Sequence, residues 1–205
     1  MNSKELKVIT SNFTDVSILL EEQKQLNRKI NRVRRKLKTK YNEYKFLQKL
    51  VGIEIIGDEL ENALKLYFKK LGFEKVDKVG KKFREEDIRL WIDNRLILFE
   101  VKGDNRPIMK DDKIFQLLKH IPNKQKKYED KIVYGVFVCN HDNLKPFNER
   151  NSNPFDERVK KLIVDSKICV ITTIELLKIF EKIEQGLMTK DDFITKLCTP
   201  GVLII

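Results

Sequence analysis

Two short segments contain the residues whose types and spacing could do chemistry. Asp87 lies in EEDIRLWID, and Glu100 and Lys102 lie in LILFEVKG. Glu-x-Lys occurs five times in the chain, but only Glu100 and Lys102 end an apolar strand-like segment, where alternation puts both side chains on one face. A carboxylate and an ammonium at the end of a buried strand cost desolvation energy and need partners. The pattern therefore predicts a polar site at this strand end.

A hairpin supplies the first partner. Segments 87–92 and 96–101 read as strands joined through Asp93 and Asn94, so cross-strand partners have numbers that sum to 187 and Asp87 faces Glu100. Two facing carboxylates repel each other unless a cation or a proton bridges them. Mg²⁺ or Mn²⁺ suits this role, because a hard divalent ion prefers carboxylate and water oxygens and keeps positions open for a phosphate.

The identity of the first acid stays open at this point. Alternation places Asp87 on the face of Arg89, whereas the preceding Glu86 shares a face with Ile88. Side-chain parity alone does not choose between the two acids. The pairing with Glu100 also requires a loop of even length, because an odd loop or a bulge would shift the register.

The elements that must position these residues follow from hydrophobic periodicity. An amphipathic helix is expected at 58–71, capped by Asp58 and stopped by Gly72. Further strands are expected at 73–79, 132–139 and 168–172, and further helices at 113–128, 155–164, 173–183 and 191–197. This order predicts an α/β domain over 53–205 with a mixed central sheet flanked by helices.

With its residues in this order, the chain resembles the PD-(D/E)xK, or restriction-endonuclease-like, nuclease superfamily over about residues 57–173. The matching pattern is GDELENALKLYFKKLGF, then Asp87, then EVKG, then a helix with Gln116, then IVYGVFVC. The resemblance implies an αβββαβ core in which Asp87 and Glu100 bind the metal and Lys102 orients or activates the attacking water. It also implies that Glu61 assists metal binding and that Gln116 serves the site.

Two further features bear on this resemblance. Glu86 stands immediately before Asp87, where proline gives the superfamily its name. After the last matching strand, Asn140, Pro146, Arg150 and Phe155 are similar to a series in one branch of these domains. The similarity makes Arg150 a candidate contact to nucleic acid.

The net charge of the chain comes almost entirely from one segment. The 205 residues include 42 Lys and Arg against 31 Asp and Glu, a formal charge of +11. Residues 24–49 hold eleven of the basic residues and the single acid Glu43, so this segment is +10. Lys and Arg in such a segment bind backbone phosphates. The predicted nucleic-acid contacts in this segment are Arg28, Arg32, Arg34, Arg35, Lys36 and Lys38.

The basic segment also has helical periodicity. Leu19, Leu26 and Val33 recur every seven residues, and a second series offset by four contains Ile30 and Leu37. This pattern is typical of the a and d positions of a coiled coil. Neither Gly nor Pro interrupts 15–51, so one long helix is expected within an N-terminal domain of residues 1–52 that forms a homodimer. A solvated basic helix that pairs with nothing is the simpler alternative.

Several classes of protein are excluded. GxSxG, GxGxxG and GxxxxGK[ST] are absent, and two histidines make a histidine-rich metal site hard to build. A mean hydropathy of −0.43 without a long apolar run gives no membrane span, and MNSKELKVIT lacks the features of a secretory signal, which predicts a cytoplasmic protein.

The favoured interpretation is a Mg²⁺- or Mn²⁺-dependent endonuclease or nickase. DNA is favoured over RNA as substrate, and a role in defence or repair would suit such an enzyme. One alternative is a catalytically inactive module that binds nucleic acid or assembles through the basic helix. Another is that the long helix docks onto a partner protein.

Overall fold

The structure, a computed structural model, describes residues 3–79, 85–109 and 114–205. Its described part divides into two compact units, residues 1–45 and residues 46–205. Helix α1 (Ser3–Leu50) forms the first unit and contributes its last turn to the second. No helix of the described residues has the length and apolar character needed to cross a membrane.

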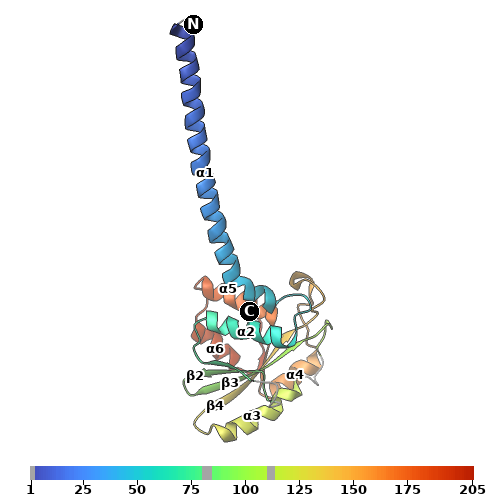
Figure 1. The fold of residues 1–205 in the computed structure, drawn as a ribbon. Coiled ribbons are helices and arrows are strands. Elements are labelled where there is room, and N and C mark those ends of the chain that lie inside the picture. The colour runs from blue at the N-terminus through green and yellow to red at the C-terminus, as the bar shows by residue number, and fades with distance from the viewer. Residues whose placement is uncertain (1–2, 80–84, 110–113) are drawn as a thin grey trace. The chain divides into compact units, whose positions relative to one another are not determined.

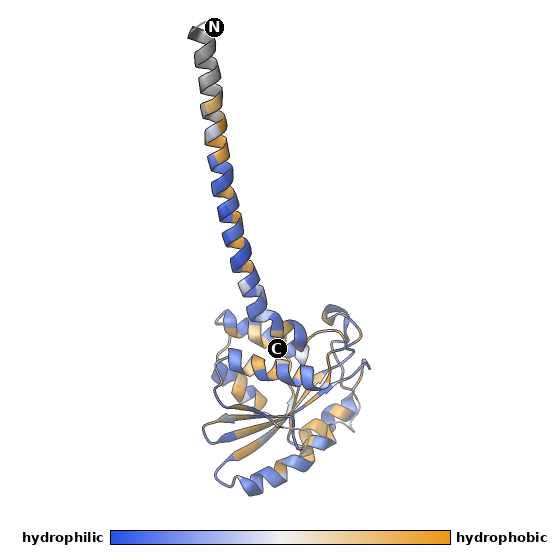
Figure 2. Cartoon of the chain, viewed as in Figure 1, coloured by the Kyte–Doolittle hydropathy of each residue, from blue (hydrophilic) through white to orange (hydrophobic). Residues whose placement is uncertain are grey.

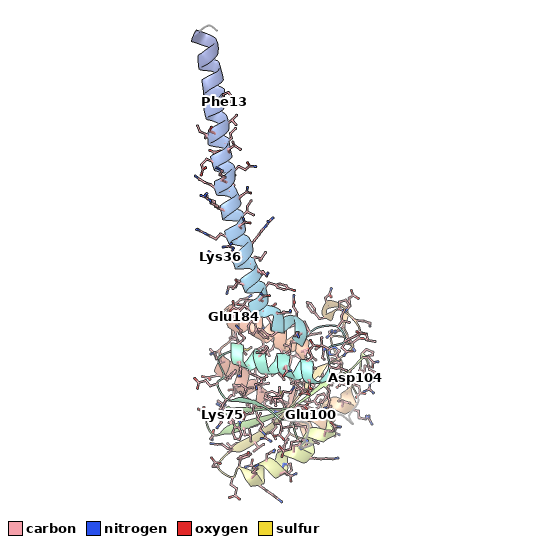
Figure 3. The ribbon with its side chains drawn as sticks, viewed as in Figure 1. Phe13, Lys36, Lys75, Glu100, Asp104 and Glu184 are labelled. Atoms are coloured by element: carbon pink, nitrogen blue, oxygen red, sulfur yellow. The ribbon has the colours of Figure 1, made fainter. Side chains whose placement is uncertain are left out.

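Helix α1 is longer than the sequence pattern predicts. It has 48 residues and starts twelve positions before residue 15, because no Gly or Pro interrupts this earlier stretch either. Apolar and hydrophilic residues alternate along it (Figure 2), and side chains such as Lys36 stand out from the helix (Figure 3). The helix therefore presents both an apolar stripe and a basic surface.

The second unit is built on a mixed sheet, which has six strands in the described residues. The strands are β1 (Val76–Lys78), β2 (Ile88–Ile92), β3 (Arg95–Gly103), β4 (Ile132–Asn140), β5 (Cys169–Thr172) and β6 (Gly201–Val202). They lie side by side in chain order; β1, β2 and β3 are antiparallel, and β3 to β6 are parallel. Strand β4 is buried along most of its length, as its continuous apolar run predicts for a central parallel strand.

Helices cover both faces of this sheet (Figure 1). They are α2 (Gly57–Lys70), α3 (Phe115–Lys127), α4 (Glu157–Asp165), α5 (Thr173–Glu184) and α6 (Lys190–Leu197), with a short 3₁₀ helix at Phe147–Glu149. Phe68 of α2 and Phe193 of α6 stack, and Phe68 also meets Phe99 of β3 with ring centroids 4.9 Å apart. On the opposite face, Leu117 of α3 and Ile163 of α4 are fully buried in one core cluster.

The predicted α/β architecture with an αβββαβ core is confirmed, with differences at element ends. The first strand begins at Val76 instead of residue 73, because Gly72 and the three residues after it connect α2 to the sheet. Strand β6 was not predicted, since two residues are too short to show a periodicity. The expected helix start at residue 113 lies outside the described residues.

The hairpin register is confirmed over the whole of β2. Trp91 pairs with Leu96 and Ile88 with Phe99, and both pairs sum to 187 as predicted. The turn places Asp93 at a φ of 50°, a left-handed conformation that a short polar side chain tolerates. The last ladder pair is Ile88 with Phe99, so the predicted pairing of Asp87 with Glu100 does not form. The backbone N–H of Asp87 instead donates to the carbonyl of Phe99 at 2.9 Å.

Candidate active site

A pocket of about 700 Å³ opens at the end of β3, beside the start of β2 and between α2 and α3. The label of Glu100 in Figure 3 marks this part of the sheet. The pocket is lined by all five catalytic residues that the sequence predicts: Glu61, Asp87, Glu100, Lys102 and Gln116. Side chains from α2, α3, β3 and the segment just before β2 thus converge on one cavity.

Lys102 lies between the two central carboxylates. Its ammonium is 2.5 Å from Oε1 of Glu100 and 3.7 Å from Oδ2 of Asp87. The same Oδ2 accepts a hydrogen bond of 2.7 Å from the backbone N–H of Val101. Asp87 and Glu100 are not ladder partners, but both of their side chains contact the ammonium of Lys102. Alternation along β3 places Glu100 and Lys102 on the same face, as predicted.

Burial and mutual repulsion perturb this cluster. Glu100 is only 3% exposed, and its pKa is raised first by burial and then by the charge of Asp87, with Lys102 offsetting part of the rise. Burial tends to lower the pKa of Lys102, but its hydrogen bond to Glu100 and the nearby carboxylates raise the pKa above its ordinary value. The carboxylates around Lys102 therefore favour the charged form of its side chain.

Glu61 adds a third carboxylate from α2. It is 4% exposed, and its Oε2 lies 3.0 Å from the ammonium of Lys78 on β1. Its negative charge also contributes to the raised pKa of Glu100. Glu61 is thus coupled electrostatically to the centre of the pocket even though it has its own ion-pair partner.

The residues present fit a hard divalent cation. In the described structure, Oε2 of Glu100 is buried and has no hydrogen-bond partner, so this carboxylate oxygen lacks the partner that a buried polar atom normally has. Asp87 supplies the second carboxylate, and oxygen ligands are those that Mg²⁺ and Mn²⁺ prefer. No group of three or more acidic, His or Cys side chains in metal-binding geometry occurs among the described residues.

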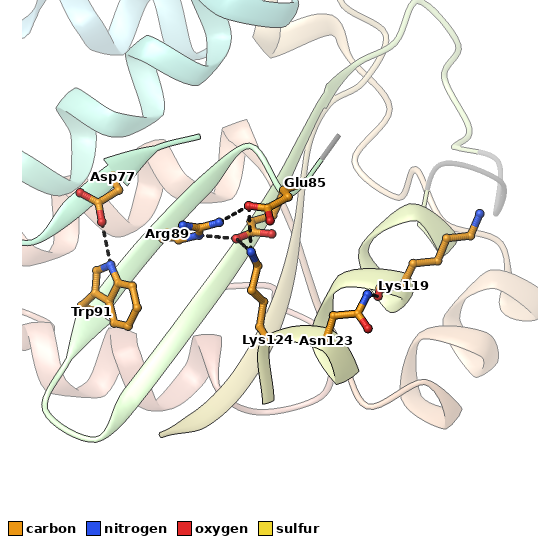
Figure 4. A network of polar contacts seen from close by, with 8 residues as sticks. Asp77, Glu85, Arg89, Trp91, Lys119, Asn123 and Lys124 are labelled. Atoms are coloured by element: carbon orange, nitrogen blue, oxygen red, sulfur yellow. Dashed lines mark hydrogen bonds and ion pairs between the residues drawn. The ribbon is translucent and has the colours of Figure 1, made fainter. Parts of the chain in front are cut away.

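A second ionic network includes Glu85, Arg89 and Lys124 (Figure 4), and it distinguishes the surroundings of Glu86 from those of Asp87. Glu86 has a fully buried side chain that pairs with Arg89 and lies 3.5 Å from the ammonium of Lys124. Glu85 forms ion pairs with the same two residues, Arg89 and Lys124, and lies 2.8 Å from the ammonium of Lys124. Residues 85–87 precede β2, so strand alternation does not extend to Glu86. Asp87 lines the pocket, and Glu86 is held on α3 instead.

Arg150, which the sequence assigned to nucleic acid, is engaged within the protein. It is 7% exposed, and its guanidinium donates to the carbonyls of Val51 and Gly52 and to the side chain of Asn140. Asn140 in turn donates to the carbonyl of Ile55 at 3.0 Å. These two residues fasten the segment after α1 to the end of β4, and Arg150 is not among the residues that line the pocket.

The fastened segment forms one wall of the pocket. Ile56 packs against Gly103 so closely that a Cβ on this glycine would lie 2.3 Å from Cγ2 of Ile56. Both residues line the pocket. The glycine of EVKG therefore allows the chain to close over the end of β3.

Three residues with ionisable side chains that the sequence did not place in the site also line the pocket: Glu85, Lys119 and His120. Lys119 and His120 follow Gln116 by three and four positions, the spacing that puts helical side chains on one face. This spacing is a signal that could have found them. Glu85 offered no such signal, because its position depends on Lys124.

The six basic residues predicted on the N-terminal segment are all exposed on α1. Arg28, Arg32 and Arg35 recur at helical spacing and share one side of the helix. In the seven-residue repeat they occupy positions outside the apolar a and d series. Their charges are therefore available to a ligand along this unit.

The order α2-β1-β2-β3-α3-β4 around a mixed sheet is that of a restriction-endonuclease-like fold. Two solved structures of the restriction endonuclease FokI, one of them bound to DNA, match with TM-scores of 0.54 and 0.55 and identities of 14% and 13%. They cover 76% of this chain, which spans 30% and 29% of the FokI chains. The small subunit of the heterodimeric restriction endonuclease R.BspD6I matches with a TM-score of 0.46 and 14% identity, over 67% of this chain and 75% of that one. No protein-family model and no curated protein matches the sequence.

Proposed function

We propose that the protein is a metal-dependent endonuclease that hydrolyses phosphodiester bonds in DNA. The observation that carries the proposal is the convergence of Asp87, Glu100 and Lys102 in one pocket of a restriction-endonuclease-like fold. The DNA-bound FokI structure supports DNA as the substrate class. The buried and unpartnered oxygen of Glu100, noted within the described residues, supports a metal as cofactor.

The carboxylates of Asp87 and Glu100 would hold Mg²⁺ or Mn²⁺, and Glu61 would assist them. When bound, the ion would polarise the scissile phosphate and lower the pKa of a bound water. Lys102 would orient the attacking water by hydrogen bonding and stabilise the negative charge that develops on the phosphate oxygens. The position of Lys102 supports this role, because its ammonium lies 2.5 Å from Glu100 and 3.7 Å from Asp87, the two proposed metal ligands.

The face of α3 would bind the flanking phosphates. Gln116, Lys119 and His120 line the pocket from this helix, opposite the side that α2 supplies. An ammonium and two polar groups at helical spacing are suited to hold a phosphodiester backbone without reading its bases. Lys119 would add a positive charge that the carboxylates at the centre of the pocket do not neutralise.

The cleavage assay is the direct test of this function. Supercoiled, linear and single-stranded DNA and RNA are incubated with Mg²⁺ or Mn²⁺, with wild type beside Lys102→Met. We expect metal-dependent cutting of DNA by the wild type and a loss of about 10²-fold or more in Lys102→Met, the size typical of removing one group that stabilises the transition state. Lys161→Met, at an exposed position of α4, is the control and should cut like the wild type.

Two outcomes would contradict the proposal. Cutting that survives Lys102→Met would refute the assignment of the site. Binding of DNA without cutting of any substrate by the wild type would favour the alternative function, a module that binds nucleic acid.

The basic side of α1 should make DNA binding depend steeply on salt. Neutralising Arg28, Arg32 and Arg35 together by substitution with Gln removes three phosphate contacts. Since each contact contributes about 0.9 to the slope of log K against log salt concentration, we expect the slope to fall by about 2.7. Fluorescence anisotropy with labelled duplex at several NaCl concentrations measures it.

A matched control removes the same charge from the second unit. Lys161, Lys167 and Lys196 are exposed and lie outside the pocket, so their joint replacement by Gln should change the slope much less. Equal changes in the two triple variants would mean that net charge, and not the α1 surface, governs binding.

A further inference from the structure

The apolar stripe of α1 is exposed to solvent within its own unit. Five apolar residues at a and d positions are between 47% and 69% exposed: Leu19, Leu26, Ile30, Val33 and Leu37. Figure 2 shows apolar positions recurring along α1. Long helices in water owe most of their stability to packing of such a face, so a stripe of this length indicates a helical partner.

The charges beside the stripe identify the partner and its direction. Positions flanking the seam carry Glu22, Lys29, Lys36 and Glu43 on one side and Arg34 on the other. In a parallel pair of identical helices, Lys29 would lie beside Arg34 of the second copy, and the two +10 segments would be aligned along their whole length. Like charges in this geometry oppose association.

In an antiparallel pair, the two Lys29–Arg34 contacts are replaced by a single contact between Lys29 and Lys29 of the second copy near the axis. With the twofold axis at the level of Arg28, residues whose numbers sum to 56 face each other across the seam. Leu19 then meets Leu37 of the second copy, Leu26 meets Ile30, and Gln23 meets Val33. Glu22 comes beside Lys36 of the second copy twice, once on each side of the axis.

We propose that α1 pairs with α1 of a second copy of this chain as an antiparallel coiled coil centred near Arg28. The seam buries the apolar stripe, and the two Glu22–Lys36 contacts select the direction. Arg28, Arg32 and Arg35 stay outside the seam, so the pair keeps a basic outer surface. The inference does not depend on nuclease activity.

Disulfide cross-linking of the full chain tests the direction. In the antiparallel pair, Leu19→Cys and Leu37→Cys are expected to cross-link when the two variants are co-expressed, and neither is expected to cross-link with itself. Two copies of residue 19 would be about 27 Å apart along the axis, far beyond the ~7 Å between Cα atoms that a disulfide spans. Wild type is the control for Cys139, Cys169 and Cys198.

A parallel pair would give the reverse result, with self-cross-linking of each single variant and none between them. That result, or the absence of any cross-link in every combination, would overturn the proposal. Gel electrophoresis without reductant separates these cases, and differently tagged copies identify mixed dimers.

Charge reversal provides an independent measurement on seam-flanking residues. Glu22→Lys and Lys36→Glu are each expected to weaken the dimer by about tenfold in sedimentation equilibrium, because each turns two attractive contacts into repulsive ones. The double variant Glu22→Lys/Lys36→Glu restores the contacts and should dimerise within about threefold of wild type. If the two changes in dimer dissociation constant simply multiply in the double variant, the antiparallel pairing is contradicted. Glu22 and Lys36 do not contact each other in a parallel pair.

Discussion

Glu100→Gln is expected to reduce metal-dependent cleavage by about 10²- to 10³-fold while leaving the protein at least as stable as the wild type. The substitution keeps the shape of the side chain and removes its charge. The activity falls because a neutral amide binds a divalent ion weakly and cannot replace the carboxylate. Cleavage of supercoiled DNA and the thermal unfolding midpoint are measured on the same preparation.

The expected stability follows from the pKa of Glu100. Burial and then the charge of Asp87 raise this pKa, so the folded protein binds a proton there more readily than the unfolded chain does. The ionised carboxylate therefore costs stability above that pKa, and Lys102 offsets only part of the cost. A neutral side chain removes the cost at neutral pH.

The matched control is Glu157→Gln on α4, where the side chain is 88% exposed. It should change neither activity nor stability. Lost activity together with a lower unfolding midpoint in Glu100→Gln would show that the substitution damages the fold, and the role of Glu100 as a metal ligand would lose its support.

Lys124→Met is expected to lower the free energy of unfolding by about 3–5 kcal/mol. Lys124 is 4% exposed, and its ammonium lies between Glu85 and Glu86. Removing it leaves the two carboxylates with Arg89 as their remaining partner in this network. A buried carboxylate that loses its cation is the main source of the cost. Urea unfolding followed by circular dichroism measures it.

Two variants test the cause of this loss. Lys126→Met, two positions along α3 and exposed, removes the same charge and should cost less than about 0.5 kcal/mol. Lys124→Met/Glu86→Gln should recover part of the stability, because it removes the buried charge that lost its partner. A double variant as unstable as the sum of the two single variants would argue against this network.

The hairpin shows which parts of the site are determined by the local sequence pattern. Alternation along an apolar strand placed Glu100 and Lys102 on one face, and the turn at Asp93 set the register that runs to Ile88 and Phe99. These features depend on neighbours within a few residues or on one short turn. Chain geometry therefore made them predictable.

Other parts of the site depend on contacts between distant segments. Arg150 bonds to Val51, 99 positions away, and no periodicity reports such a contact. The choice between Glu86 and Asp87 likewise depends on Lys124, which reaches them only once α3 packs on the sheet. Side-chain parity failed there because the strand begins after both acids.

The contacts of α2 link the pocket to the order in which the chain is synthesised. Most residues of the pocket belong to α2, β3, α3 and the segment before β2, which emerge from the ribosome before α5 and α6. Yet Tyr67 of α2 donates to the carbonyl of Leu176 on α5, and Phe68 stacks on Phe193 of α6. The helix that carries Glu61 therefore obtains its full packing only after α6 has been made. A nascent chain would carry every residue of the pocket for some time before it could hold them rigidly, so the packed pocket should form late in synthesis.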